Sequence, residues 1–478
     1  MLADIAIHKK EWKKGIKYLN KLLTMNVSFA STEYLKLANC YSHVGKLTKC
    51  KETVESGIAL HPNDKKLWKK YVDIAIHEKE WLLAKQGLKI ICSDESASMD
   101  RWIELSMIYQ LMGEHENAQE TFDYVLQRYS DKVSEDEKGY RKLTIFDNGE
   151  SRIEFYKKLK KTEQVIVTFD SINMEWQNPS FSFKLLASQR LDIVAVRKKK
   201  KQTYQQDLTQ SDFLSCTTNL TSDYKDKVAY GFSLGAYNTL YFASLLECRI
   251  LAISPRLSIH PIYGRTKIIP KYEFNQNISL PYNKNIAPII VFDPKNNLDN
   301  RYVYEEVLSA FPNAKLIKTP YAGHGVAPHL SKTGQLKEFI LTVLNNKTPR
   351  YNRKLRVKSP RYYRLLADKC LQHNKPKWSL HLIDRSLAIL PMEKLAIKTK
   401  IQALHAIKEY EVAVSYLRKS ILKAPNILTY RNLLIDTYLL MERFRDADDE
   451  LQLAFQQFGE MPSLYRRKKM LEKLFVSY

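Results

Sequence analysis

The sequence predicts a multidomain protein of the α and α/β classes, with a mostly parallel sheet, covered by helices on both faces, between two α-solenoid segments. Two observations indicate this. Short apolar runs separated by longer stretches occupy the middle of the chain, as in buried parallel strands. A spacing of 34 residues recurs on both sides of this middle part. We therefore expect three domains: helical repeats in residues 1–135, an α/β domain in residues 136–350 and further helical repeats in residues 351–478.

The first repeat segment is marked by aromatic, small and turn residues at the 34-residue period. These are Tyr34, Trp68 and Trp102; Cys50, Ala84 and Ala118; and Gly45, Lys79 and Gly113. The third copy of the repeat, residues 102–122, also has Leu105 and Phe122 in the places expected for the tetratricopeptide repeat (TPR), which it resembles. This resemblance implies paired helices and concave surfaces that bind partner proteins. Because Met1 begins inside a repeat without a polar capping helix, we expect the natural chain to extend further upstream.

The same period returns near the end of the chain. Ser379, Ala413 and Ala447 share it, as do Pro391 and Pro425. Small residues are expected where two paired helices cross closely. Helical hairpins are therefore predicted from about residue 361 to residue 458 and on to the end of the chain.

The segment VAYGFSLG contains a serine flanked by two glycines. Ser233 lies two residues after Gly231 and two before Gly235, which is the G-x-S-x-G spacing of a nucleophile elbow between a strand and a helix. An apolar strand precedes it, and residues 236–246 have helical periodicity. The context favours a reactive serine over a plain glycine-rich turn.

A candidate acid and a candidate histidine follow in the order Ser, acid, His. The apolar strand in residues 287–292 leads into a loop with Asp293 and Asp299, and His324 lies between two glycines after a further strand. With the elbow, this resembles the α/β-hydrolase superfamily over residues 140–346. The resemblance implies a triad of Ser233, Asp299 and His324. Asp299 is preferred because it lies farther into the loop, directly before a helical segment; Asp293 is the alternative acid, or a carboxylate that caps the loop.

The resemblance also implies an oxyanion hole. One donor is the backbone N–H of Leu234, the residue after the nucleophile. The second comes from the loop after the strand in residues 164–169, which makes it Ser171 or Ile172. This loop lacks the HGGG sequence of many lipases, so the choice between the two stays open.

Basic residues are unevenly distributed over the chain, which carries a formal charge of +24. Residues 1–135 contain 20 basic and 19 acidic side chains, against 31 and 20 in residues 136–350 and 25 and 13 in residues 351–478. The densest run follows the strand in residues 191–196, where ligands of α/β sheets bind. We expect this run to be a substrate-binding surface that attracts polyanions, and the alternative is a solvated face. It consists of Arg197, Lys198, Lys199, Lys200 and Lys201.

The composition of the chain indicates the cellular compartment in which we expect the protein. There is no signal peptide and no apolar run long enough to span a membrane, and the six cysteines lack paired or metal-type spacing. We therefore expect a reducing cytoplasm, with association to a membrane-bound polysaccharide assembly complex, and no bound metal or cofactor. No nucleic-acid recognition motif is visible, which argues against that class of partner.

The sequence thus predicts a serine acyl-enzyme. The first hypothesis is an O-acetyltransferase that uses acetyl-CoA as donor and an anionic, capsule-type bacterial polysaccharide as acceptor. It is based on a loose resemblance of this arrangement to hydrolase-fold proteins of capsule loci. The alternatives are a carboxylesterase or deacetylase on a similar substrate, and a non-catalytic TPR scaffold with a hydrolase-like docking domain.

Overall fold

The computed structural model describes residues 2–25, 29–94, 96–135, 139–278 and 285–476. Contacts within the chain divide it into two compact units. The first comprises Met1–Leu251, Leu257–Pro261 and Arg265–Ala287, and the second comprises Ala252–Arg256, Ile262–Gly264 and Pro288–Tyr478. Each helical segment is therefore grouped with the part of the α/β region next to it in sequence. The predicted boundary at residues 135 and 136, and the last two residues of the third predicted domain, touch positions outside the described residues.

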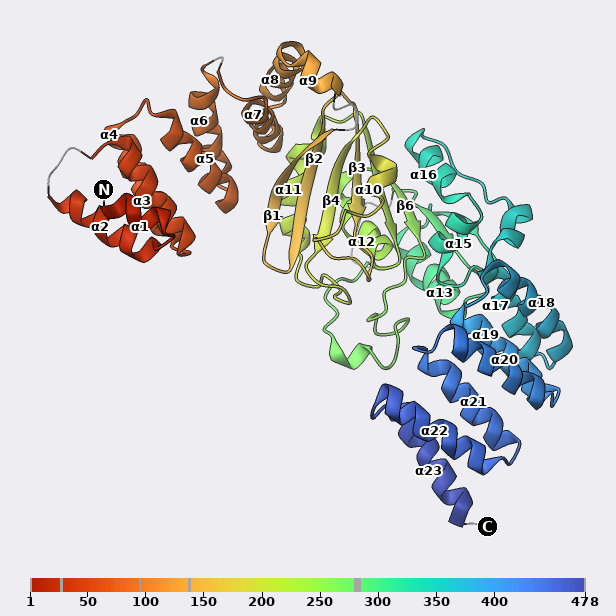
Figure 1. The fold of residues 1–478 in the computed structure, drawn as a ribbon. Helices are drawn as coiled ribbons and strands as arrows, with labels where there is room; N and C mark the ends of the chain where they lie inside the picture. Colours follow the sequence, from red (N-terminus) through yellow and green to blue (C-terminus); the bar gives the residue numbers. More distant parts are fainter. Residues whose placement is uncertain (1, 26–28, 95, 136–138, 279–284, 477–478) are drawn as a thin grey trace. The chain divides into compact units, whose positions relative to one another are not determined.

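The N-terminal segment forms successive helix pairs (Figure 1). Buried small residues at the repeat positions Cys50, Ala84 and Ala118 allow the helices to approach closely. The helices are α1 (Leu2–His8), α2 (Trp12–Thr24), α3 (Ser31–His43), α4 (Leu47–Leu60), α5 (Lys65–Glu78), α6 (Trp81–Cys92), α7 (Met99–Leu111), α8 (His115–Arg128) and α9 (Ser130–Glu135).

The turn positions of this repeat share a backbone conformation. Gly45, Lys79 and Gly113, which are 34 residues apart, have φ values of 74°, 65° and 80°. A left-handed residue ends a helix and turns the chain into the next one, and glycine adopts it without the steric cost of a side chain. The sequence period thus reflects a repeated turn as well as repeated packing.

The C-terminal segment repeats this design. Ser379, Ala413 and Ala447 are fully buried, and their helices pack around one apolar core. The helices are α17 (Pro360–Gln372), α18 (Pro376–Ile389), α19 (Lys394–Ala406), α20 (Tyr410–Lys423), α21 (Leu428–Leu440), α22 (Phe444–Phe458) and α23 (Pro462–Val476).

Between these segments in the sequence, the described residues form eight strands in one sheet, in the order β1-β2-β4-β3-β5-β6-β7-β8. β2 runs antiparallel to β1 and β4, whereas β3 is parallel to β4 and β5, and β7 is parallel to β8. This mostly parallel sheet confirms the predicted fold class. The strands are β1 (Tyr140–Asp147), β2 (Ser151–Lys158), β3 (Gln164–Phe169), β4 (Asp192–Lys198), β5 (Asp226–Phe232), β6 (Arg249–Ile253), β7 (Ile289–Phe292) and β8 (Lys315–Lys318).

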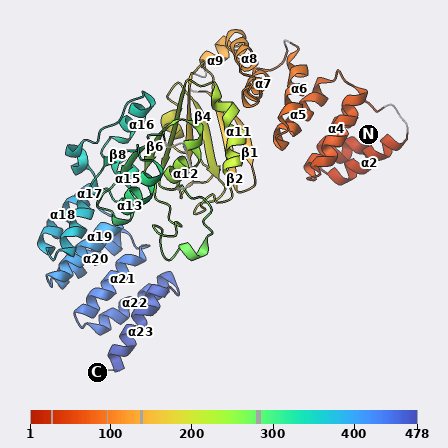
Figure 2. The same cartoon turned by 180° about the vertical axis from the view of Figure 1, so that it is seen from behind.

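Helices follow the strands of this region. In the first unit, α11 and α12 lie over one face of the sheet, as the reverse view shows (Figure 2). The helices are α10 (Phe183–Leu186), α11 (Gln210–Ser222), α12 (Leu234–Phe242), α13 (Asn297–Tyr302), α14 (Leu308–Ala310), α15 (Val326–Lys332) and α16 (Leu336–Leu344), with short 3₁₀ or π turns at Ala243–Leu246, Ile269–Lys271, Val303–Val307 and Arg353–Lys358.

The N-terminal helices and the sheet are joined within the first unit by buried polar contacts. Gln110 of α7 donates its side-chain N–H to the carbonyl of Leu220 in α11 at 3.2 Å. The side chain of Gln110 also accepts a hydrogen bond from Lys157 of β2 at 3.1 Å. Contacts of this kind explain why the first unit extends across the predicted domain boundary.

Across the described ranges, none of the helices combines the length and the apolar character needed to cross a bilayer.

Candidate active site

Ser233 occupies the sharp turn between β5 and α12, with φ 55° and ψ −117°. This conformation is unfavourable for a residue with a side chain, and such strain is typical of a nucleophile elbow. The flanking glycines are required sterically. A Cβ on Gly231 would collide with the carbonyl of Gly235 and lie 2.5 Å from Oγ1 of Thr239, and a Cβ on Gly235 would collide with the carbonyl of Phe169.

Three backbone N–H groups near this turn are the expected oxyanion donors. Those of Leu234, Ser171 and Ile172 make no hydrogen bond to the part of the chain that the structure describes. The built Cβ of Gly235 is 3.4 Å from the carbonyl oxygen of Asp170, so the loop that carries Ser171 passes directly beside the start of α12. The carbonyl of Ser171 accepts from the N–H of Met174 at 3.1 Å.

In the second unit, His324 lies against Asp299. Its Nδ1 is 3.0 Å and 3.1 Å from the two carboxylate oxygens. Arg256 donates from Nε to the same carboxylate at 2.6 Å, and its Nη1 donates to the carbonyl of Tyr263 at 3.0 Å. Burial favours a raised pKa for Asp299, but the hydrogen bond from His324 and the charges of His324 and Arg256 outweigh it and hold the pKa below its ordinary value.

Asp293, the alternative acid, has a different environment. It accepts hydrogen bonds from the backbone N–H groups of Lys295 at 2.8 Å, Tyr321 at 3.1 Å and Gly323 at 2.6 Å. Burial raises the pKa of this carboxyl despite these bonds. Asp293 thus ties the loop after β7 to the loop that carries His324, and it is Asp299 that the structure brings to the imidazole.

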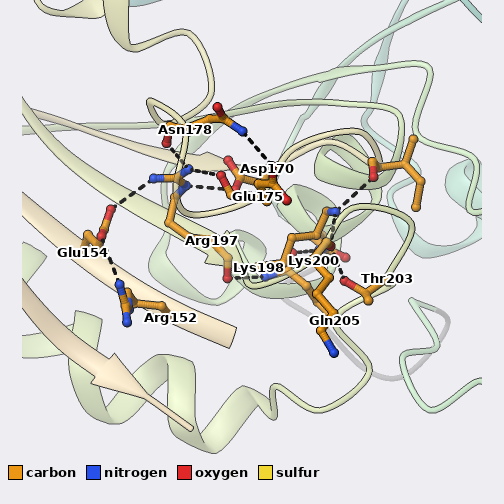
Figure 3. A network of polar contacts seen from close by, with 12 residues as sticks. Arg152, Glu154, Asp170, Glu175, Asn178, Arg197, Lys198, Lys200, Thr203 and Gln205 are labelled. Carbon is orange, nitrogen blue, oxygen red and sulfur yellow. Dashed lines mark hydrogen bonds and ion pairs between the residues drawn. The ribbon is translucent and has the colours of Figure 1, made fainter. Parts of the chain in front are cut away.

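The basic run after β4 requires a correction. Arg197 and Lys198 belong to the strand itself and are buried, so they cannot form part of an exposed substrate surface (Figure 3). Lys198 donates to the carbonyls of Ile172 at 3.0 Å and Lys200 at 2.8 Å, and burial lowers its pKa to about 8. The strand continues two residues beyond its apolar run. Because the pleat sends consecutive side chains to opposite faces, Arg197 and Lys198 are buried on different faces of the sheet.

The other three lysines of the run are accessible in part or in full. Lys199 lies 3.6 Å from Glu150 and Lys201 lies 3.2 Å from Glu175, while Lys200 is exposed. Only these three remain candidates for contact with a polyanion.

Arg256, which donates a hydrogen bond to Asp299, is the residue of the candidate site that the sequence interpretation missed. It follows the buried strand β6 and is itself only 6% exposed. A cation just past the end of a buried strand was the available signal, since ligand sites of α/β sheets form at the carboxyl ends of the strands.

No protein-family model and no curated protein sequence matches this chain. Several solved structures are similar to it, over part of the chain or nearly all of it. An esterase of Pyrococcus furiosus is 14% identical, with a TM-score of 0.31, over 44% of this chain and 90% of its own. Est1E of Butyrivibrio proteoclasticus is 15% identical, with a TM-score of 0.28, over 43% of this chain and 99% of its own. Yeast Tom70 is 12% identical, with a TM-score of 0.25, over 99% of this chain and 94% of its own. All three TM-scores are below 0.5, so none of these likenesses bears on activity or partners.

Proposed function

We propose that this protein is a serine-dependent acyl-transfer enzyme of the α/β-hydrolase type. The observation that carries the proposal is the contact of His324 Nδ1 with the buried carboxylate of Asp299, in a chain that also holds Ser233 in a strained elbow. A histidine bound to a carboxylate through Nδ1 uses Nε2 to exchange protons. That Ser233 acts together with His324 and Asp299 is part of the proposal.

In the first step, Oγ of Ser233 attacks the carbonyl carbon of an ester or thioester, and His324 takes the hydroxyl proton. The carbon–oxygen bond to Ser233 forms, the bond to the leaving alcohol or thiol breaks, and the imidazolium returns its proton to that leaving group. Asp299 holds the ring and stabilises its positive charge. Water or a second hydroxyl then attacks the acyl-enzyme by the same route in reverse.

The negative charge of each tetrahedral intermediate needs preorganised donors. We assign the N–H of Leu234 as one, because it is the first residue of α12 and has no helical acceptor within the described chain. Ser171 or Ile172 supplies the second from the neighbouring loop. One such donor is worth roughly 10²- to 10³-fold in kcat.

Within this class, we propose O-acetyl transfer from acetyl-CoA to an anionic, capsule-type polysaccharide. The support is the excess of basic side chains in residues 136–350 and 351–478, which favours polyanionic substrates by electrostatic attraction. A carboxylesterase or deacetylase on a similar polymer would use the same catalytic residues. The two are distinguished by whether the acyl group leaves the enzyme to a sugar hydroxyl or to water.

A scaffold remains the alternative from another class, because paired helices make up both ends of the chain and TPR-like surfaces bind protein partners. The two possibilities differ in whether Ser233 is reactive: it should be reactive in an enzyme and unreactive in a scaffold.

The test has two arms. The protein is first treated with a fluorophosphonate, which should label Ser233 in the wild type and fail to label Ser233→Ala. It is then incubated with acidic bacterial polysaccharides and acetyl-CoA, and NMR follows acetyl esters on the polymer and free acetate. Transfer to sugar supports the acetyltransferase, and release of acetate alone supports the esterase. A wild type that resists the probe and turns over no ester would leave the scaffold.

A further inference from the structure

Arg197 is the centre of a buried network in the first unit (Figure 3). Its side chain is 1% exposed and makes four hydrogen bonds. Nε donates to the carboxylate of Asp170 at 2.8 Å, Nη1 to that of Glu154 at 3.2 Å, and Nη2 to the carbonyls of Glu175 at 2.9 Å and Asn178 at 2.7 Å. A guanidinium has a planar fork of five donors, and no other side chain could make this set of bonds.

The charges of this network are compensated locally. Glu154 also accepts from Tyr156 at 2.7 Å and lies 3.3 Å from Lys142, whose side chain is half exposed. Asp170 has no cation other than Arg197 within ion-pair distance among the described residues, and one of its carboxylate oxygens lacks a hydrogen-bond partner there. Burial raises the pKa of Asp170, and the charge of Arg197 opposes that shift.

A buried ion pair of this kind is weak evidence for stability, because desolvation offsets much of its attraction. The more informative question is which part of the chain this ion pair holds in place. Asp170 is the first residue after β3, and Glu175 and Asn178 lie further along the same loop. Arg197 thus binds the loop at its first residue, Asp170, and at the carbonyls of Glu175 and Asn178. Ser171 and Ile172 lie between these points.

Backbone contacts from the same strand complete the support. Lys198 donates from Nζ to the carbonyl of Ile172, and its own carbonyl accepts from the N–H of Trp176 at 2.8 Å. The N–H of Gln202 donates to the carbonyl of Ile172 at 2.8 Å. These bonds fix the peptide group between Ile172 and Asn173. The N–H of Met174, which donates to the carbonyl of Ser171 at 3.1 Å, fixes the preceding peptide group, which carries the N–H of Ile172.

We propose that Arg197 is a positioning residue which, with Asp170, holds the loop after β3 so that a backbone N–H of Ser171 or Ile172 points at the developing oxyanion. The buried start of the basic run thus positions the loop, and only its exposed end, Lys199 to Lys201, remains available to attract a substrate. This inference rests on the proposed acyl-transfer function, because an oxyanion donor has meaning only where an oxyanion forms.

The test compares transition-state and ground-state binding. Arg197→Lys keeps the charge but loses the fork, and Arg197→Ala loses both; circular dichroism and active-site titration with a fluorophosphonate count the folded, competent molecules. Per competent site, we expect kcat for p-nitrophenyl acetate to fall about 10- to 100-fold, in proportion to a weakened oxyanion donor, with KM changing less than threefold. A trifluoromethyl ketone, whose adduct with serine carries an oxyanion, should lose affinity by the same factor as kcat.

Two further variants and one rescue experiment sharpen the result. Asp170→Asn, which is nearly isosteric, should reproduce the loss of kcat, and it decides the question if the Arg197 variants do not fold. Added guanidinium ion should partly restore Arg197→Ala. Lys142→Met removes an outer partner of Glu154 and should leave kcat unchanged.

The two levels of proposal fail in different ways. If the wild type is neither labelled nor active, the acyl-transfer function itself is wrong. If the wild type is active and folded Arg197 and Asp170 variants keep its kcat and its ketone affinity, only the positioning role is overturned. Loss of thermal stability without loss of kcat would likewise assign Arg197 to the fold alone.

Discussion

Arg256 donates its Nε to Asp299 at 2.6 Å, and the carboxylate that receives it is 1% exposed. Asp299 therefore has two cationic or polar partners, Arg256 on one side and His324 on the other. A carboxylate that orients a histidine must stay ionised, and a buried one does so only if its charge is compensated. Arg256 provides compensation that does not depend on the protonation state of the histidine.

Removing Arg256 should therefore change the pH dependence of catalysis. The positive charge of Arg256 lowers the pKa of Asp299, so Arg256→Met raises it, and the acid limb of kcat/KM should move to higher pH. We expect about a tenfold lower kcat/KM near neutrality. Hydrolysis of p-nitrophenyl acetate between pH 4 and 9 measures both effects, and Arg256→Lys is the control that keeps the charge. An acid limb identical to that of the wild type would refute this role.

The two candidate acids should differ sharply. Asp299→Asn leaves the fold intact but removes the negative charge beside His324, and should lower kcat by roughly 10³- to 10⁴-fold. Asp293→Asn keeps one acceptor oxygen for the backbone N–H groups of Lys295, Tyr321 and Gly323. Its main cost should be about 1–2 kcal/mol of folding free energy, as for an unsatisfied buried hydrogen bond. Esterase rates and urea unfolding of both variants check the ranking, and the reverse order would mean that the wrong carboxylate was assigned.

Acid should destabilise the protein through His329. This side chain of α15 is fully buried, its Nε2 contacts the hydroxyl of Tyr351 at 2.8 Å, and its Nδ1 has no hydrogen-bond partner in the described chain. Burial and the charge of Arg361 lower its pKa from 6.5 to about 4. Between these values the unfolded chain binds the extra proton and the folded chain does not, so stability falls as the pH drops through this window.

The full effect is on the order of 3 kcal/mol, since one pKa unit corresponds to about 1.4 kcal/mol. Urea unfolding at pH 7 and pH 4.5 should show a smaller acid loss in His329→Gln than in the wild type. His373→Gln, which changes an exposed histidine, is the matched control. Equal acid losses in all three proteins would exclude His329 as the cause.

The exposed part of the basic run should act on polymer but not on small esters. Replacing Lys199, Lys200 and Lys201 by Gln should raise KM for an anionic polysaccharide several-fold at low salt and leave p-nitrophenyl acetate hydrolysis unchanged. The difference should shrink toward physiological salt, because exposed charges are screened beyond roughly 8 Å at 0.15 M. The control replaces three exposed lysines of the charge-balanced first segment: Lys65, Lys66 and Lys69. If both triple variants bind polymer as the wild type does, the basic surface serves solubility only.

The sequence was most informative where local geometry dictates residue type. The elbow at Ser233 needs glycine on both sides for steric reasons, and the apolar runs of β3, β5 and β7 indicate buried strands regardless of context. The contact of Arg256 with Asp299 depends instead on which loops meet at the sheet edge. Those residues are 43 positions apart, and nothing local in either one encodes the pairing.

The basic run shows the opposite limit. A string of five cations is normally a solvated face, and the sequence alone places it on the surface. The structure extends β4 as far as Lys198, with Arg197 opposite Arg152 and Lys198 opposite Ser151 in the register with β2. Burial of Arg197 then depends on carboxylates from β2 and from the loop after β3, which only the assembled sheet brings together.

The left-handed turn residues allow the stability of the helical segments to be changed without altering the proposed catalytic residues. The positions equivalent to Gly45 and Gly113 are filled elsewhere by Lys79, Asn374, Lys408 and Glu442, all with positive φ. Glycine at Lys79, Lys408 or Glu442 would relieve the steric cost of a side chain in this conformation, which is about 1 kcal/mol per residue. These turns lie far in sequence from the elbow and the loops that carry the acid and the histidine. They offer an engineer a means of making the protein more heat-resistant while leaving Ser233, Asp299 and His324 untouched.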